Sequence, residues 1–320
     1  MRAATRLVLS VGLFVSFTFC TQALCKAEAA AKWDKAEIIR AWAQQESEFD
    51  SVAIEWDENQ ILSVGDFGQP QKRRRERLGE THRFLIKGNM YRFEQKAVAN
   101  AGDGEWADQS LITAFDGHVN QSLLPKESLK FAQGSISAGK EFMDLPSIHL
   151  RPILMAFRPR CILDLTGDIR VKQELVDVDG IECVEISQII KLDVQPEFAM
   201  SLYCLPEQEF LPIRYEDRQG ETLLAQVNVL YSRNYGPYEV PETWWSYISA
   251  ADGEIREGAA GAVNTVIINE DIADAEFTLK FPVGARLNQG GKQYEIMPDG
   301  SRKLLTPEDL KKSLQDRPPL

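Results

Sequence analysis

Residues 82–95, HRFLIKGNMYRFEQ, carry the clearest structural signal in the chain. On one side of the pair Gly88-Asn89, Phe84 and Ile86 alternate with Arg83 and Lys87, and on the other side Tyr91 and Phe93 alternate with Arg92 and Glu94. An alternation with a period of two places the apolar side chains on one face of a strand, and a Gly-Asn pair suits a two-residue turn. The stretch therefore predicts an antiparallel hairpin with one apolar, aromatic face.

The same alternation recurs through most of the 320 residues, and tight turns such as Asp116-Gly117 and Asp179-Gly180 join neighbouring segments. Consecutive hairpins of this kind form a meander, so we expect a mainly β, α+β protein with antiparallel strands. Helical spacing of apolar residues predicts helices at 32–47 and 145–157, and Thr306 has the position of an N-cap for a short final helix. Strands are expected at 52–57, 82–87, 91–95, 110–115, 118–124, 169–178, 181–191, 199–204, 211–217, 223–232, 263–268, 276–281 and 292–297, with a further hairpin within 264–287.

The first 29 residues have the pattern of a secretory signal peptide. A basic start precedes an uncharged apolar run of 13 residues, Leu7–Phe19, and small residues follow it. That run is short for a membrane span of about 20 residues, which makes a membrane anchor the alternative. Acylation at Cys20 or Cys25 is a second alternative, although the residues before each match a small-residue cleavage site poorly. We expect an exported protein, periplasmic or extracellular, without a transmembrane segment.

Charge and composition exclude some classes of partner. The formal net charge is −12, with 44% hydrophobic and 26% charged residues, which is ordinary for a globular protein. An acidic balance disfavours nucleic-acid binding, because a phosphate backbone needs a basic surface. One basic run interrupts this balance and suggests a loop for an anionic partner, with a solvated loop as the alternative. Its residues are Lys72, Arg73, Arg74, Arg75 and Arg77.

No catalytic or metal-binding motif is recognisable. The three histidines, His82, His118 and His149, are not spaced as metal ligands, and neither C-x-x-C nor G-x-S-x-G occurs. The abundant carboxylates are typical of a solvated surface. We therefore expect no enzyme activity, no cofactor and no metal.

Two cysteines fall at matching positions of a predicted hairpin. If strands 181–191 and 198–205 turn near Val194, Cys183 and Cys204 lie opposite each other. Export permits a disulfide, and cross-strand spacing allows one. The alternative is a pair of small buried thiols.

The early strands are rich in aromatic residues on their apolar faces. Bulky side chains that converge on a bent sheet suggest the lining of an apolar cavity, and a filled core is the alternative. The residues concerned are Ile54, Trp56, Phe84, Ile86, Tyr91, Phe93 and Phe115.

The order of segments resembles a known superfamily. A helix from Trp33 runs directly into a strand ending in Trp56, a meander follows, and residues 205–214, LPEQEFLPIR, form a Pro-Glu-x-x-x-x-Pro-x-Arg link between strands. Over residues 33–245 the chain resembles the LolA-like superfamily of exported proteins, which includes lipoprotein carriers and stress-signalling sensors.

The resemblance implies a strongly curved antiparallel half-barrel with helices that cover its concave side. It divides the chain into a signal peptide at 1–29, the half-barrel at 30–245 and an extension at 246–320. It implies a non-enzymatic binding protein that holds a lipid or acyl chain in an apolar cavity, with a lipid or lipoprotein as partner. It transfers no functional residue by position. The alternatives are a structural or protein-interaction module with a filled core, and a hydrolase with a dispersed site.

Overall fold

The computed structural model of the chain describes residues 32–63, 77–100, 106–125, 131–139, 148–191, 196–232, 238–250, 252 and 255–309. Two α-helices lie wholly in this part, α1 (Lys35–Ser47) and α2 (Arg151–Phe157), and residues 307–309 are the start of a further helix. The strands of the first half are β1 (Ser51–Ser63), β2 (Arg77–Lys87), β3 (Met90–Asn100), β4 (Trp106–Phe115), β5 (Val119–Leu124), β6 (Gln133–Ala138), β7 (Asp168–Val171) and β8 (Val176–Val178). Those of the second half are β9 (Ile181–Ile190), β10 (Phe198–Leu205), β11 (Leu211–Gln219), β12 (Thr222–Ser232), β13 (Val240–Ser249), β14 (Ile255–Ile268), β15 (Arg286–Gln289), β16 (Lys292–Ile296) and β17 (Arg302–Leu304).

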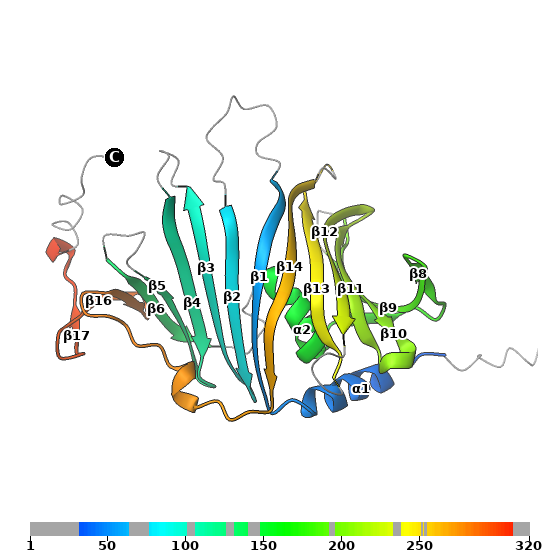
Figure 1. The fold of residues 1–320 in the computed structure, drawn as a ribbon, viewed down its shortest axis with the longest axis horizontal. Coiled ribbons are helices and arrows are strands. Elements are labelled where there is room, and N and C mark those ends of the chain that lie inside the picture. Colours follow the sequence, from blue (N-terminus) through cyan, green and yellow to red (C-terminus); the bar gives the residue numbers. More distant parts are fainter. Residues whose placement is uncertain are drawn as a thin grey trace, which may run out of the picture.

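One curved, unclosed sheet contains nearly all of these strands (Figure 1). From one edge to the other the order is β17, β16, β15, β6, β5, β4, β3, β2, β1, β14, β13, β12, β11, β10 and β9, and both β7 and β8 pair with β9. Neighbours are antiparallel except β15 and β6, which are parallel. The predicted mainly β half-barrel is confirmed.

Strand β14 joins two runs of consecutive hairpins. It pairs with β13 on one side and with β1 on the other, for example Ile54 with Val266. Residues beyond 245 therefore lie inside the sheet, while the domain boundaries at 29 and 245 stay predictions. The pairing of β1 with β14 makes one continuous concave surface from two separate parts of the sequence.

Two predicted strands are wrong in detail. The segment 169–178 is interrupted into β7 and β8. The apolar alternation at 276–281 belongs to a short 3₁₀ helix, Asp274–Phe277, and an irregular segment rather than to a hairpin. In that segment the Leu279 N–H donates to Gln121 Oε1 at 3.0 Å, so its backbone bonds to a side chain instead of a partner strand. The hairpin of this region is formed later, by β15 and β16.

The main core lies on the concave face, between the sheet and α2. Six of the seven residues of α2, Pro152 to Phe157, are buried, and the helix packs on β11, β12 and β13. Pro152 stands in the first turn, where its missing N–H has no helical partner to lose. Burial on this scale stabilises the fold by about 1.5–3 kcal/mol for each large side chain.

Helix α1 covers one end of the hollow (Figure 1). Asp34 caps it by accepting from the Ala36 N–H, and Ile38, Trp42 and Glu46 share its buried face at a spacing of four residues. The Trp42 indole N–H donates to Phe210 O at 2.9 Å. This bond ties the helix to the link before β11.

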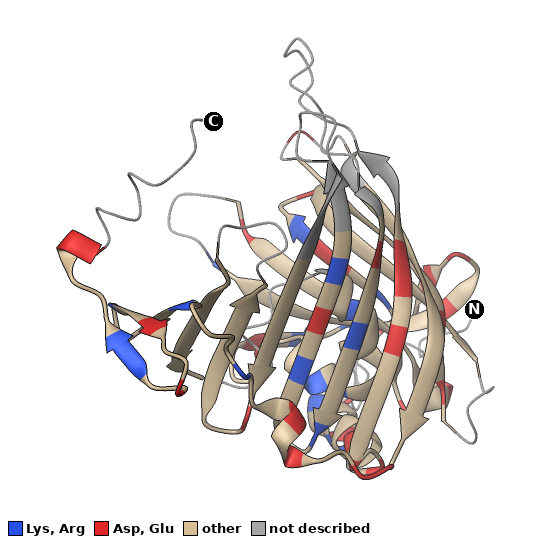
Figure 2. Ribbon diagram, turned by 60° about the vertical axis from the view of Figure 1, so that its left-hand side comes forward, with Lys and Arg blue, Asp and Glu red and all other residues tan. Residues whose placement is uncertain are grey.

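The outer face of β1 to β3 is polar. Figure 2 shows acidic and basic residues side by side on neighbouring strands of this face. Arg83 lies 3.3 Å from Glu55 on β1 and 3.9 Å from Glu94 on β3. Such exposed pairs add little stability, but they mark this face as solvent-exposed and the opposite face as the core side.

Gly261 of β14 allows a tryptophan to lie flat on the concave face. A Cβ atom at Gly261 would lie 2.1 Å from the Trp244 ring. The Trp244 indole is 3% exposed and lies edge-on to Trp56, with ring centroids 5.8 Å apart. A side chain at position 261 would push the indole out of this packing.

We expect Gly261→Val to lower the free energy of unfolding by about 1–3 kcal/mol, because it overpacks the core. Ala262→Val is the matched control, since Ala262 is exposed on the outer face of the same strand. Urea unfolding of both variants measures the difference, and equal stabilities would contradict the role assigned to Gly261.

Candidate functional site

The seven side chains expected to line a cavity lie together on the concave face. Ile54, Trp56, Phe84, Ile86, Tyr91, Phe93 and Phe115 all belong to one buried cluster, and each is at most 3% exposed. The same cluster contains Leu150 and the residues 153–157 of α2. The side chains thus converge on the hollow of the bent sheet, and in this structure protein side chains fill that hollow.

A separate pocket of about 650 Å³ lies at the edge of this cluster. Its lining comes from the C-terminal half of α1 and the residues after it, from the turn between β2 and β3, and from the segment after α2: Ala43, Glu46, Ser47, Phe49, Asp50, Gly88, Asn89, Arg158, Arg160 and Cys161. Phe49 links it to the core, because the Phe49 ring packs edge-on against Phe157 at 5.0 Å. None of the seven predicted residues lines it.

The concave face changes from apolar to charged along β1 and β2. Four successive pairs of opposite residues show this change: Val52–Ile86, Ile54–Phe84, Trp56–His82 and Glu58–Glu80. Glu58, Glu80 and His82 are buried at 3%, 7% and 0% exposure. With His149, these residues form what we call the polar end of the hollow.

Aromatic stacking holds the polar end together. The His82 ring stacks on Trp56 at 4.9 Å, on Phe93 at 5.7 Å and on His149 at 5.8 Å. His149 belongs to the 3₁₀ turn Ile148–Leu150 directly before α2, and its Nδ1 contacts Glu58 Oε1. The polar end therefore connects β1 and β2 to the segment that leads into α2.

His82 is held neutral in this setting. Its pKa is lowered to about 4, mainly by burial and to a smaller extent by the neighbouring His149, while the charges of Glu58, Glu80 and Asp57 oppose the shift. Its Nε2 lies 3.4 Å from Glu80 Oε2, and neither ring nitrogen has a hydrogen-bond partner. No group of three or more His, Cys, Asp or Glu within the described ranges is arranged to hold a metal ion.

The spacing of charged residues in the sequence indicates the polar end, although no motif does. Glu58 follows Trp56 by two residues, and His82 and Glu80 precede Phe84 by two and four residues. These spacings place charged side chains on the same strand faces as the aromatic ones. A charged residue at an inward position is unusual and marks a site that needs an explanation.

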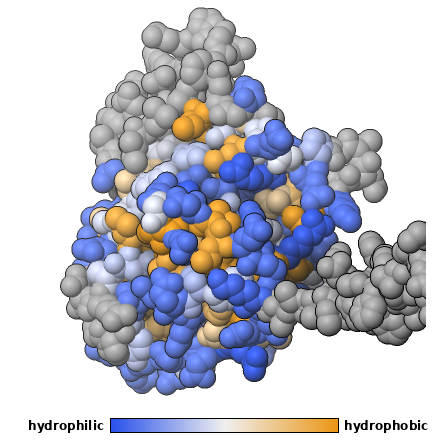
Figure 3. All heavy atoms as spheres, turned by 90° about the vertical axis from the view of Figure 1, so that its right-hand side faces the viewer, coloured by the Kyte–Doolittle hydropathy of each residue, from blue (hydrophilic) through white to orange (hydrophobic). Residues whose placement is uncertain are grey.

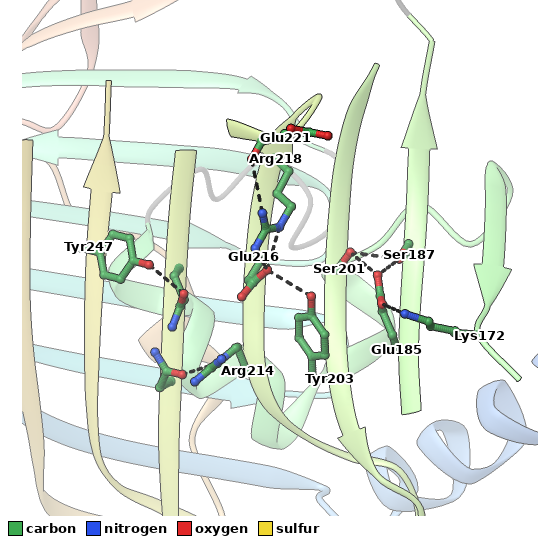
Figure 4. Close-up of polar contacts among 12 residues, drawn as sticks. Lys172, Glu185, Ser187, Ser201, Tyr203, Arg214, Glu216, Arg218, Glu221 and Tyr247 are labelled. Atoms are coloured by element: carbon green, nitrogen blue, oxygen red, sulfur yellow. Dashed lines mark hydrogen bonds and ion pairs between the residues drawn. The ribbon is translucent and has the colours of Figure 1, made fainter. Parts of the chain in front are cut away.

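A second polar group lies on the outer face of β9 to β13 (Figure 4). Buried Glu216 accepts from the Tyr203 hydroxyl at 3.1 Å and from Arg218 Nε at 2.9 Å, and burial raises the pKa of Tyr203. On the neighbouring strands the hydroxyls of Ser187 and Ser201 are 2.9 Å apart. These groups bind one another across the strands, which explains them as a stabilising network.

The predicted disulfide is wrong. Cys183 and Cys204 are both free and fully buried, and Cys204 lies opposite Val184 rather than Cys183. A shift of one residue reverses the face of a strand, so Cys183 packs in an outer cluster with Tyr203 while Cys204 packs in the main core. Burial raises the pKa of both thiols.

Three other expectations fall outside the described residues. The basic run Lys72 to Arg75 and the side chain of Arg77, where β2 begins, are among them, as are the predicted signal peptide and Cys25. The anionic-partner loop and the signal peptide stay predictions. No helix in the described part of the chain is long and apolar enough to cross a membrane.

Comparison with known proteins gives a likeness of fold. No protein-family model and no curated protein matches the chain. The fold is similar to that of LolA-superfamily structures. A domain from Vibrio parahaemolyticus assigned to outer membrane lipoprotein sorting has 9% sequence identity and a TM-score of 0.47, over 76% of this chain and 95% of its own.

Two further structures are similar over comparable lengths. A LolA-superfamily protein from Nitrosomonas europaea has 12% identity and a TM-score of 0.39, over 76% of this chain and 97% of its own. A β-barrel-like protein of a domain of unknown function from Brucella abortus has 10% identity and a TM-score of 0.29, over 70% and 99%. These likenesses concern the course of the chain alone.

We expect acid to destabilise the protein through His82. An unfolded histidine takes up a proton near pH 6.5, whereas His82 in the folded chain does so near pH 4. The stability linked to His82 is therefore complete above pH 6.5 and is lost as the pH falls to about 4, by about 3 kcal/mol in all.

Urea unfolding at pH 7.5 and pH 4.5 measures this loss in the wild type and in His82→Phe, which keeps the ring stacking. The loss is expected to shrink in His82→Phe and to stay unchanged in His118→Phe, because His118 lies exposed in a turn. An equal loss in the wild type and His82→Phe would contradict the assignment.

Proposed function

We propose that the chain is an exported, non-enzymatic binding protein that holds an acyl chain on its concave face, in the place of α2. The main support is that a single helix of seven residues packs in the same buried cluster as the aromatic residues of the hollow. The partner is a lipid or a lipoprotein, as the sequence suggested. A binding role of this kind needs no nucleophile, cofactor or metal.

The free energy lost when α2 leaves the hollow and the free energy gained when an acyl chain takes its place are of similar size. Six buried residues of α2 would be exposed on leaving, at a cost on the order of 10 kcal/mol for side chains of mixed size. An acyl chain gains about 0.8 kcal/mol for each CH₂ that it buries, so about 14 such groups gain on the order of 10 kcal/mol as well. A near balance suits a protein that both takes up and releases its ligand.

The two ends of α2 are held differently. At its C-terminal end, the buried guanidinium of Arg158 donates to Phe157 O at 2.8 Å, to Glu46 O and Phe49 O at 3.3 Å, and to Gly88 O at 3.5 Å. Burial lowers the pKa of Arg158. The N-terminal end has fewer ties among the described residues: Leu150 provides no side-chain cap, Arg151 donates to Ile162 O at 3.4 Å and lies over the Tyr215 ring, and His149 contacts Glu58. Displacement is therefore expected to begin at the N-terminal end, with Arg158 as the fixed point.

Loosening α2 should strengthen acyl binding. Leu154→Ala removes a side chain of α2 that is 3% exposed, and it weakens the covered state relative to the open one. Leu287→Ala is the matched control, because Leu287 is fully buried in the separate cluster of β15 and its neighbours. A monoacylglycerol with a dibrominated acyl chain is the probe, since bromine quenches the fluorescence of Trp56 and Trp244 on contact.

Wild-type fluorescence is expected to be quenched with saturation, and Leu154→Ala is expected to bind at least about tenfold more tightly. Leu287→Ala should bind as the wild type does. The proposal fails if no variant shows quenching while circular dichroism reports a folded protein.

A filled hollow also favours a second candidate, a protein-interaction module. Figure 3 shows an apolar area framed by hydrophilic residues on the side where β8 to β10 lie. Ile181 and Ile190 of β9 are 45% and 36% exposed, and the short edge strands β7 and β8 leave backbone groups at the border of the sheet. This side can pair with a second protein without any change in the core.

In this second case, Ile181→Asp is expected to remove most of a partner protein that copurifies with the wild type. Val283→Asp is the control, because Val283 is 63% exposed in another part of the chain. Quantitative mass spectrometry of the three purified samples gives the answer. Equal partner yields in all three would rule out this side as the interface.

A further inference from the structure

Unpartnered polar atoms gather at the polar end of the hollow. Nine buried side-chain nitrogen and oxygen atoms of the described residues have no hydrogen-bond partner, and five of them belong to neighbouring residues here. The five are Trp56 Nε1, Trp244 Nε1, Glu58 Oε2, and Nδ1 and Nε2 of His82. Buried polar groups are nearly always paired, so a cluster of five calls for a partner that the chain does not supply.

The sheet register places a donor and an acceptor on two sides of one glycine. Gly261 lies opposite Trp244 on β13 and opposite Glu58 on β1. Trp244 Nε1 would lie 2.6 Å from a Cβ atom at Gly261, so the indole N–H lies over the glycine, beside Glu58. The absence of a side chain at position 261 thus lets the indole lie across the glycine, so that its N–H and the Glu58 carboxylate belong to the same part of the polar end.

The hydrogen-bonding chemistry of Trp244 and Glu58 determines which ligand head would fit the polar end. Trp244 Nε1 can only donate, and a carboxylate oxygen such as Glu58 Oε2 can only accept. A single group satisfies both when it accepts and donates, as a hydroxyl or an amide does. Neutral His82 adds one further donor and one further acceptor. A carboxylate or phosphate would satisfy the donors but leave Glu58 Oε2 without a hydrogen-bond donor.

The charges at the polar end favour the same kind of ligand head. Glu58 and Glu80 face this end from β1 and β2, and Asp57 adds a negative charge from the neighbouring position. Among the described residues, the basic side chains beside them are His82, which burial keeps neutral, and His149, which contacts Glu58. A second buried anion here would be repelled, because like charges interact strongly where water is excluded.

We propose that the polar end is a head-group site, which selects acyl ligands with an uncharged hydroxyl or amide head over those with a carboxylate or phosphate head. The inference rests on the proposed acyl-binding function and adds the class of ligand to it. Glu58, Trp244 and His82 bind the head, while the chain extends along the aromatic part of the hollow. Glu58 is the residue that sets the preference.

The test compares two probes with the same dibrominated chain, a monoacylglycerol and the free fatty acid, at pH 7.5. Quenching of tryptophan fluorescence should show the monoacylglycerol bound at least about tenfold more tightly by the wild type. In Glu58→Gln the fatty acid should bind more tightly, and the preference should nearly vanish. Glu55→Gln is the matched control, since Glu55 lies on the outer face of the same strand and pairs with Arg83.

A second pair of variants tests the donor independently of the charge. Trp244→Phe keeps an aromatic ring but removes the N–H, so it should weaken the monoacylglycerol several-fold more than the fatty acid. Trp245→Phe, at the next position and 40% exposed, should change neither. Trp56 still reports binding in both variants.

The outcomes separate the two ideas. If the wild type binds both probes equally, or the fatty acid more tightly, the head-group site is overturned while acyl binding stands. A preference that survives both Glu58→Gln and Trp244→Phe also overturns it. If neither probe binds any folded variant, both acyl binding and the head-group site are wrong.

Discussion

The pairing of β1 with β14 is the constraint on which the rest of the structure depends. Apart from the parallel pair β6–β15, each flank of the sheet consists of local hairpins, and among the described strands it is these two that connect the flanks. Without the pairing there would be two narrower sheets and no common hollow for α2. The register within it matters as well. An irregularity between Glu55 and Trp56, where β14 contributes one extra residue, turns Val263 and Gly261 toward the core. Without this irregularity, Ala262 and Ala260 would face inward instead, and no glycine would lie beneath Trp244.

On the outer face of the sheet, buried polar groups such as Glu216 have hydrogen-bond partners, whereas several of the described ones on the inner face have none. On the outer face, Glu216 has two partners, and Glu185 accepts from Ser187 at 3.0 Å while lying 3.6 Å from Lys172 (Figure 4). On the inner face, the polar end keeps five atoms without a partner in a region that is at least as buried. Stability alone would favour apolar residues at such positions, since a half-satisfied polar cluster is worse than an apolar core. The contrast within one sheet is therefore the strongest indication that the inner polar groups serve a ligand.

Local patterns in the sequence predicted the strands better than they predicted their partners. The hairpin around Gly88-Asn89 formed as expected because its turn and its alternation are both local. The bridge between Cys183 and Cys204 failed because a pairing centre misjudged by half a residue shifts the register by one, and one residue reverses the face. The position of β14 could not be read from its own residues, because its two neighbours lie in distant parts of the chain. The seven aromatic and aliphatic residues converged as expected, but no local pattern indicated that α2 would cover them.

If the chain binds acyl ligands as proposed, the contact between His149 and Glu58 would couple the binding of the acyl chain to that of the ligand head. His149 precedes α2 by two residues, so a displacement of the helix from its N-terminal end carries the imidazole away from Glu58. That would leave a buried carboxylate without its partner, which is costly in a core. A bare acyl chain could replace the apolar contacts of α2 but not this interaction. A ligand whose head donates a hydrogen bond to Glu58 replaces both the apolar contacts of α2 and the contact with His149. Ligands without such a head would therefore displace the helix less easily.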